Sequence, residues 1–224
     1  MSFRSDYMDY EINLLDDKVP QEAEEIVEDS LVKAQEKLPM EQKTVLDLEW
    51  SEYEFVVEKM GGASGYAKYP DIINIGLNTC SDSWKSSLQA SVFHEYAHIW
   101  DYEQRGQQWE KHWEYILGEA LTQHFTEQNA EYESPWRKKH SREDIAEYWP
   151  QIRDTELDKD MEDVDFRGEE SLFVNEGNGK YPNWLGYSLS YQIGEQLLSN
   201  NNLDDFPEIE KEEIIEVGNK LYTK

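Results

Sequence analysis

The sequence predicts an α+β fold, in which a small antiparallel sheet packs on a long helix and a mostly helical lobe follows. Apolar and polar residues alternate along residues 44–78, which is the period of strands with one buried face. Along residues 84–102 and 107–128, apolar side chains recur every three or four positions, as in amphipathic helices. The 224 residues suffice for one domain, expected as an N-terminal lobe over residues 1–83 and a helical lobe over residues 84–224.

The first expected helix of the N-terminal lobe covers residues 20–38. Pro20 suits its first turn, the glutamates that follow suit the positive end of a helix, and Pro39 ends it. Residues 1–19, which are polar and acidic, are expected to form either an arm or a short helix.

Three stretches with the strand period follow this helix. They are Leu46–Trp50, Tyr53–Val57 and Ile73–Leu77, and together they predict one small antiparallel sheet. A glycine-rich segment, residues 61–67, lies between the last two. It lacks the Gly-Lys-Ser/Thr ending of a phosphate-binding loop, so we exclude nucleotide binding there.

The helix expected over residues 84–102 carries His94, Glu95 and His98 in the order His-Glu-x-x-His. Histidines four residues apart project from the same helix face, so both imidazoles can bind one metal ion. The carboxylate of Glu95 reaches the same region without being a ligand. This pattern is typical of zinc hydrolases. The alternative is that both histidines pack in the core of an amphipathic helix.

The next helix supplies a candidate third ligand, Glu119. Zinc sites for hydrolysis have three protein ligands and an open position for water. Glu119 lies in a strongly apolar segment, where burial of a carboxylate is costly unless a cation compensates it. We therefore expect Zn²⁺ bound by His94, His98 and Glu119. Asp101 could orient a ligand histidine, although a surface position is expected for it in so acidic a chain, and His124 is expected to pack in the core.

The rest of the helical lobe is expected to contain two short helices split at Pro150, a helix over residues 184–198 and a last helix over residues 207–222. The chain has one basic cluster, residues 137–142. We favour ion pairs with nearby acidic residues for this cluster, and a site for a substrate carboxylate is the alternative.

His94-Glu95-Tyr96-Ala97-His98, followed by Glu119 in Gly-Glu-Ala-Leu-Thr, resembles the gluzincin clan of zinc metallopeptidases. The segment Pro-Asn-Trp-Leu-Gly-Tyr at 182–187 is similar to one in a family of largely uncharacterised Zn-dependent proteases of that clan. The resemblance covers about residues 61–198 and implies a zincin-like fold. In thermolysin-like members an Asp one turn after the glutamate ligand often orients a histidine, whereas this chain has Gln123 there.

The resemblance implies hydrolysis of peptide bonds in peptides or proteins. Zinc would lower the pKa of bound water to about 7, and Glu95 would take its proton and pass it to the leaving amine. Related enzymes stabilise the oxyanion with a downstream Tyr or His, and Tyr187 is the first candidate here and Tyr191 the second. Ordinary aromatic packing is the alternative for both. The segment at 61–67 is either a flexible turn or part of the rim of the substrate site.

The net charge of −28 comes from 49 acidic and 21 basic residues spread along the whole chain. This distribution favours a solvated acidic surface, as in proteins of extreme halophiles, although Lys outnumbers Arg and Glu outnumbers Asp, against the usual halophilic trend. The same charge disfavours binding to nucleic acid.

Three features predict a cytoplasmic protein, expected in a high-salt cytoplasm. No apolar run approaches the length of a membrane span, so no membrane association is expected. The N-terminus lacks the apolar region of a signal peptide, and Cys80 is the only cysteine. No feature of the sequence indicates an oligomeric state.

The alternative function is that of a non-catalytic acidic binding protein on a zincin fold, either a mimic of nucleic acid or a peptide-binding pseudoenzyme. Glu95 discriminates between the two functions. A binding protein gains nothing from a general base beside three metal ligands, and all four positions are filled here.

Overall fold

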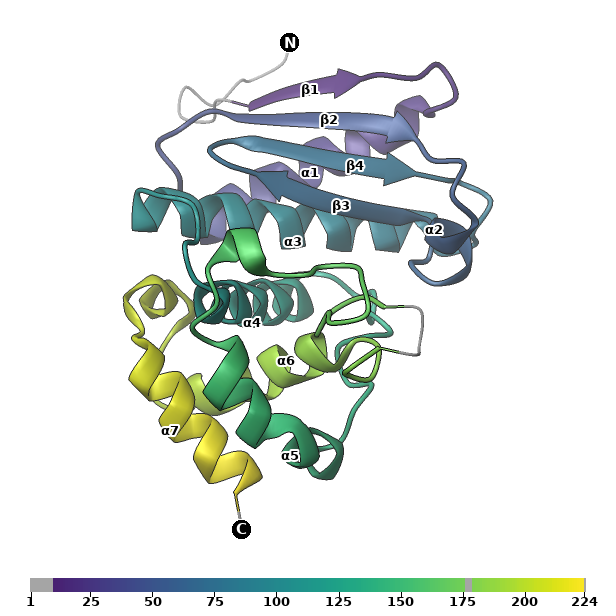
Figure 1. Ribbon diagram of the computed structural model, residues 1–224. Helices are drawn as coiled ribbons and strands as arrows, with labels where there is room; N and C mark the ends of the chain where they lie inside the picture. The colour runs from purple at the N-terminus through teal and green to yellow at the C-terminus, as the bar shows by residue number, and fades with distance from the viewer. Residues whose placement is uncertain (1–9, 176–178, 224) are drawn as a thin grey trace. The chain divides into compact units, whose positions relative to one another are not determined.

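The computed structural model describes residues 10–175 and 179–223, which form two compact units. The first unit contains the chain up to Gln108 together with Phe125–Glu133. The second contains Trp109–His124 and the chain from Ser134 onward. The sheet lies in the first unit, and helices and loops form the second (Figure 1).

The sheet consists, within the described residues, of strands in the order β1-β2-β4-β3. They are β1 (Tyr10–Leu14), β2 (Thr44–Trp50), β3 (Ala63–Lys68) and β4 (Ile72–Leu77). Strands β1, β2 and β4 are parallel, and β3 is antiparallel to β4. The fold is thus α+β with a small mixed sheet.

The expectation of an antiparallel sheet is therefore wrong, except for the pair of β3 and β4. Alternating apolar and polar residues show which face of a strand is buried, but not the direction of its neighbour. Direction follows from the connections, and helix α1 (Gln21–Lys37) joins β1 to β2 as a crossover, which makes the two strands parallel. Strand β1 lies in the stretch expected as an arm or a short helix, of which residues 1–9 are outside the described part.

The strand expected at Tyr53–Val57 is also wrong, because Glu54–Glu58 form the short helix α2. Tyr53 is 75% exposed and Val56 is buried, so burial there follows the opposite phase of the expected alternation. The additional strand is β3, which lies mostly in the glycine-rich segment. Gly61 and Gly62 have φ values of 74° and 108° and form the turn that leads into it.

Helices α1 and α3 (Trp84–Arg105) cover one face of the sheet (Figure 1). The fully buried side chains beneath them include Leu46, Leu48, Ile73 and Ile75. Asp47 and Asn74, on the opposite face of β2 and β4, are partly exposed. Helix α3 ends at Gly106, a left-handed residue with φ 69°.

The second unit is organised around α4 (His112–Asn129), whose last turn from Phe125 belongs to the first unit. Its other helices are α5 (Arg142–Gln151), α6 (Leu185–Leu197) and α7 (Lys211–Tyr222), with short 3-10 segments at Met161–Asp163 and Leu203–Glu208. Trp149 of α5 packs on Gly218 of α7 and donates a hydrogen bond to Asn219 Oδ1 at 3.0 Å.

Pro150 does not split the helix as expected. It lies inside α5, and the backbone continues without a break into a π-helical turn at Ile152–Glu156. The proline removes only the backbone donor of residue 150, and the helix continues past it.

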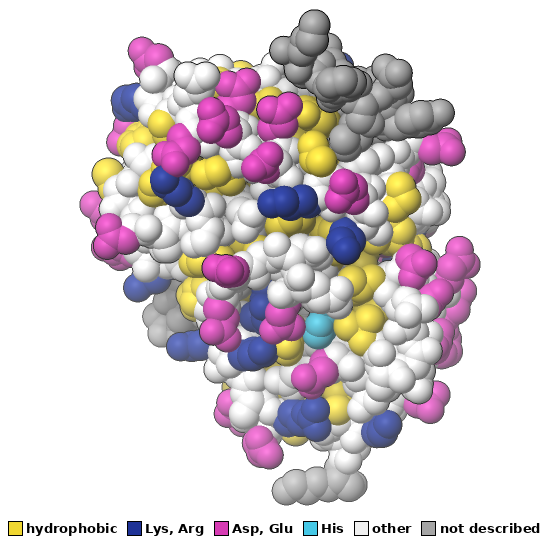
Figure 2. Space-filling model, turned by 180° about the vertical axis from the view of Figure 1, so that it is seen from behind, with side chains coloured by type: hydrophobic (Ala, Val, Ile, Leu, Met, Phe, Trp, Pro, Cys, Tyr) yellow, Lys and Arg dark blue, Asp and Glu magenta, His cyan; other side chains and the backbone are white. Residues whose placement is uncertain are grey.

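Acidic side chains are scattered over the face shown in Figure 2 and alternate with lysines and arginines. Several basic residues form exposed ion pairs, such as Lys18 with Glu52 and Lys111 with Asp160. None of the helices in the described ranges combines the length and the apolar character that crossing a bilayer requires.

Candidate metal centre

Helix α3 places His94 and His98 one turn apart. Their ring centroids are 4.8 Å apart and the rings are nearly perpendicular, at 88°. His98 is buried and His94 is partly exposed. Val92, Phe93, Tyr96 and Ile99, which lie between and beside them, are buried, so packing fixes this stretch of the helix.

Glu95 is buried and points toward β3. A Cβ atom at Gly65 would lie 2.7 Å from Glu95 Cγ and 3.1 Å from its Oε1. Any side chain at position 65 would therefore displace the Glu95 carboxylate. Because a glycine is needed at this position, β3 lacks part of the alternation of apolar and polar residues from which strands are predicted.

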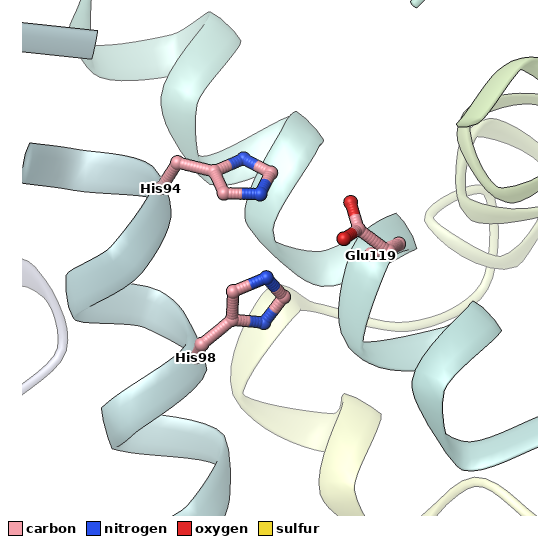
Figure 3. Close-up of side chains that lie close together, drawn as sticks. All are labelled: His94, His98 and Glu119. Atoms are coloured by element: carbon pink, nitrogen blue, oxygen red, sulfur yellow. The ribbon is translucent and has the colours of Figure 1, made fainter. Parts of the chain in front are cut away.

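Glu119 of α4 completes a group of three potential ligands. One ligand atom from each of His94, His98 and Glu119 lies within 4.8 Å of the other two, and Figure 3 shows the side chains turned toward one another. Glu119 is only 2% exposed. Two imidazoles and a carboxylate are the ligand set of many catalytic zinc sites, where tetrahedral bonds of about 2.1 Å put the ligand atoms about 3.4 Å apart. The three residues therefore fit zinc after small side-chain rotations.

Aromatic packing holds both ends of the α4 segment that carries Glu119. Phe125 meets Phe93, the residue before His94, edge to face at a centroid distance of 5.8 Å. Trp109 lies against Gly118, where a Cβ would be 2.6 Å from the indole. Gly118 thus admits a tryptophan ring directly beside Glu119.

The surface position expected for Asp101 is wrong. Asp101 is fully buried and accepts a hydrogen bond from Arg105 Nε at 3.0 Å, one turn along α3. The sequence contains no signal for this burial, because an acidic residue near a helix end is most often solvated. The ion pair between Asp101 and Arg105 can be recognised only once both side chains are known to be buried.

Gln123 and His124 connect α4 to α6 within the second unit. Gln123 Nε2 donates to the backbone oxygen of Tyr187 at 3.1 Å. His124 is buried as expected, stacks on Tyr191 at a centroid distance of 4.5 Å and has its Nε2 2.9 Å from the Tyr191 backbone oxygen. Gln123 therefore binds a backbone carbonyl, and His124 packs in the core.

The two candidate tyrosines differ in their surroundings. The ring of Tyr191 is buried, with His124 on one side and Lys138 Nζ 4.9 Å from its centroid. Tyr187 is partly exposed, and its ring lies 5.0 Å from Phe173 and 5.9 Å from Trp136. Both rings thus take part in aromatic packing.

The second unit contains a buried ionic cluster that no sequence pattern predicts. Glu156 is buried and accepts hydrogen bonds from Lys180 and Tyr181 at 2.7 and 2.8 Å, and it pairs with Lys159 at 2.6 Å. Burial alone would raise the pKa of Glu156, but the hydrogen bonds from Lys159, Lys180 and Tyr181 outweigh it and lower the pKa to about 2.

His112, at the start of α4, adjoins this cluster. Its Nδ1 is 3.3 Å from the Glu156 backbone oxygen, and its ring contacts Tyr115 and Phe173. Burial lowers the pKa of His112 to about 4. The side chain of His112 is buried.

Comparison with known proteins adds one match. Residues 23–216 match the model of a family described as "Predicted Zn-dependent protease (DUF2268)". No curated protein and no solved structure matched the chain significantly. The matched range includes all three residues of the possible metal site.

Proposed function

Because the chain belongs to this family of predicted Zn-dependent proteases, we propose that it is a gluzincin-type metallopeptidase that hydrolyses peptide bonds in peptides or proteins. The observation that carries the proposal is the convergence of His94, His98 and Glu119. The position of Glu95, directly after His94, favours an enzyme over a non-catalytic acidic binding protein.

His94, His98 and Glu119 would hold the zinc ion. Zinc supplies Lewis-acid activation of water and of the scissile carbonyl when it is bound there. The two histidines come from one turn of α3, which fixes their spacing, and Glu119 contributes a negative charge that partly compensates the cation.

Glu95 is the general base of the proposed reaction. Its carboxylate takes a proton as water oxygen adds to the carbonyl carbon, and it passes that proton to the amine nitrogen as the carbon–nitrogen bond breaks. The lack of a side chain at Gly65 supports this assignment, because it leaves room for the buried carboxylate beside β3.

Strand β3 is the proposed binding edge for an extended substrate. In the described residues it pairs with β4 on one side, so its second edge can pair with a peptide backbone. Tyr66 of this strand is 59% exposed. We interpret the glycine-rich segment as the turn and strand of this edge.

Tyr187 is the proposed donor to the oxyanion, and Tyr191 is the second candidate. The ring of Tyr191 is buried between His124 and Lys138, whereas Tyr187 is partly exposed. A donor must reach the oxygen on which charge develops, which favours the more accessible hydroxyl. We also propose a high-salt cytoplasm as the place of action, from the charge of −28.

Metal analysis and peptide hydrolysis test the proposal together. We expect about one zinc ion per chain in the wild type and in Glu95→Gln, and loss of zinc in His98→Ala and Glu119→Ala. Only the wild type should hydrolyse a peptide library. Folded wild-type protein that takes up no zinc, even after zinc is added, would contradict the metal site. Full activity of Glu95→Gln would contradict the assigned base.

A further inference from the structure

Trp184 has a backbone conformation that large side chains rarely adopt. Its φ of 70° and ψ of 13° lie in the left-handed region, and no other non-glycine residue in the described ranges has a positive φ. Asn183 and Gly186, close by in the sequence, are of the types that adopt this conformation readily. A tryptophan at this position therefore points to a use for the indole that offsets the strain.

Hydrogen bonds on both sides of Trp184 hold this conformation. Its backbone N–H donates to Phe173 O at 2.9 Å, and the N–H of Gly186 donates to Leu172 O at 2.7 Å. The side chain of Asn183 accepts from the Asn175 N–H at 3.0 Å. The indole is thus presented from a rigid backbone.

The indole joins two other aromatic side chains, and we call Trp136, Trp184 and Tyr187 the aromatic trio. The Trp136 centroid is 6.3 Å from that of Trp184 and 5.9 Å from that of Tyr187. All three side chains are partly exposed. Neither indole N–H donates to a protein acceptor within the described part of the chain, so both donors are available to a ligand.

The trio is linked to the helix that carries Glu119. Gln123, one turn after Glu119 on α4, donates to the backbone oxygen of Tyr187. Ser188, the next residue of α6, donates from its hydroxyl to the backbone oxygen of Trp136 at 3.0 Å. The trio therefore belongs to the framework that supports the proposed third ligand.

We propose that the aromatic trio is the subsite that binds an aromatic or large aliphatic side chain of the peptide substrate. This inference rests on the proposed peptidase function. Exposed ring faces bind apolar side chains, and indole N–H groups at their edge match the carbonyl acceptors of a peptide. A purely structural role would be served with less strain by glycine or asparagine at position 184.

Binding to the inactive Glu95→Gln protein tests the subsite without cleavage. Two pools of fluorescein-labelled hexapeptides, one with a fixed Phe and one with a fixed Gly, are titrated by fluorescence polarisation with and without zinc. We expect the Phe pool to bind about tenfold more tightly. In the double variant Glu95→Gln/Trp184→Gly, the Phe and Gly pools should bind with about equal affinity. The melting temperature of this variant should stay the same or rise, because the backbone strain at position 184 is relieved.

A control substitution outside the trio and a second substitution within it complete the test. Trp50→Phe changes a partly exposed tryptophan of β2 in the first unit and should keep the Phe preference. Trp136→Ala removes the neighbouring indole without altering position 184 and should abolish the preference even if Trp184→Gly does not fold. A Phe preference that survives both trio substitutions, or that is absent from the parent protein, overturns the subsite.

The outcomes also separate this subsite from the peptidase function. A Phe preference in a protein that binds no zinc would support the trio as a binding site while contradicting the hydrolase. Zinc binding and hydrolysis without a Phe preference would contradict the trio alone.

Discussion

Gly65 of β3 and Glu95 of α3 are in such close contact that only a glycine fits between the strand and the carboxylate. A Cβ at position 65 would lie 2.7 Å from Glu95 Cγ. Since Gly65 has no positive φ, alanine is allowed there by the backbone, and its effect would come from this contact alone.

Gly65→Ala should therefore act on the proposed base and leave the proposed ligands in place. We expect peptide hydrolysis to fall about 10- to 100-fold in kcat, because a small displacement of a catalytic group is costly. Zinc content should be unchanged. Gly76→Ala on β4 is the control, since its Cβ would meet Ser51 Cβ at 3.2 Å, away from Glu95. Wild-type kcat in Gly65→Ala would show that this contact does not position the base.

Protonation of His112 should destabilise the protein below neutral pH. Its pKa is about 4 in the folded protein and about 6.5 in an unfolded chain. The unfolded chain therefore binds the proton first, and stability that is complete above pH 6.5 is lost as the pH falls toward 4. From pH 6.5 to pH 5, this protonation should lower the free energy of unfolding by about 2 kcal/mol.

Urea unfolding of the wild type and of His112→Gln at a series of pH values measures this contribution. Because the two proteins differ only at residue 112, the difference between their free energies of unfolding isolates the contribution of His112. That difference should shrink by about 2 kcal/mol from pH 6.5 to pH 5. A difference that is constant over this range would contradict a depressed pKa for His112.

Glu156→Gln should destabilise the second unit at neutral pH. The substitution leaves Lys159 and Lys180 beside a neutral group, although both amines retain partial contact with water. We expect a loss of about 2 kcal/mol at pH 7, less than for a fully buried pair. The loss should diminish as the pH falls through 4.5 toward 2, because the wild-type carboxylate, with its pKa near 2, loses its own advantage there.

Asp158→Asn is the matched control for this cluster. Asp158 pairs with Lys211 at 2.8 Å, but its side chain is 71% exposed. Exposed pairs contribute little, so its free energy of unfolding should stay within about 0.5 kcal/mol of the wild type. Equal effects of the two substitutions would mean that burial of Glu156 does not strengthen its ion pairs.

The parts of the site that the sequence predicts depend on the spacing of residues within one helix. The His-Glu-x-x-His pattern on a helix fixes where His94 and His98 project, whatever surrounds the helix. The sequence predicts Glu119 as a ligand because a carboxylate in an apolar segment needs a compensating partner. The grouping of these three side chains agrees with that prediction, while their roles remain proposals.

Features that depend on contacts distant in sequence could not be predicted. The direction of β1 relative to β2 depends on the crossover through α1, and strand β3 lacks an apolar run because its small residues make room for α3. Glu156 finds Lys180 and Tyr181 at sequence separations of 24 and 25 residues. The periodicity of residues within a single helix or strand cannot predict an ion pair or hydrogen bond between such distant residues.

The large negative charge predicts that salt stabilises the folded protein. With a net charge of −28, repulsion between carboxylates opposes the compact state, and dissolved ions screen it. The melting temperature should rise steadily from low salt to molar potassium chloride. Because exposed ion pairs such as Lys18–Glu52 weaken in salt, a rise also means that repulsion outweighs these attractions. A melting temperature that does not change with salt would remove the argument for a high-salt cytoplasm.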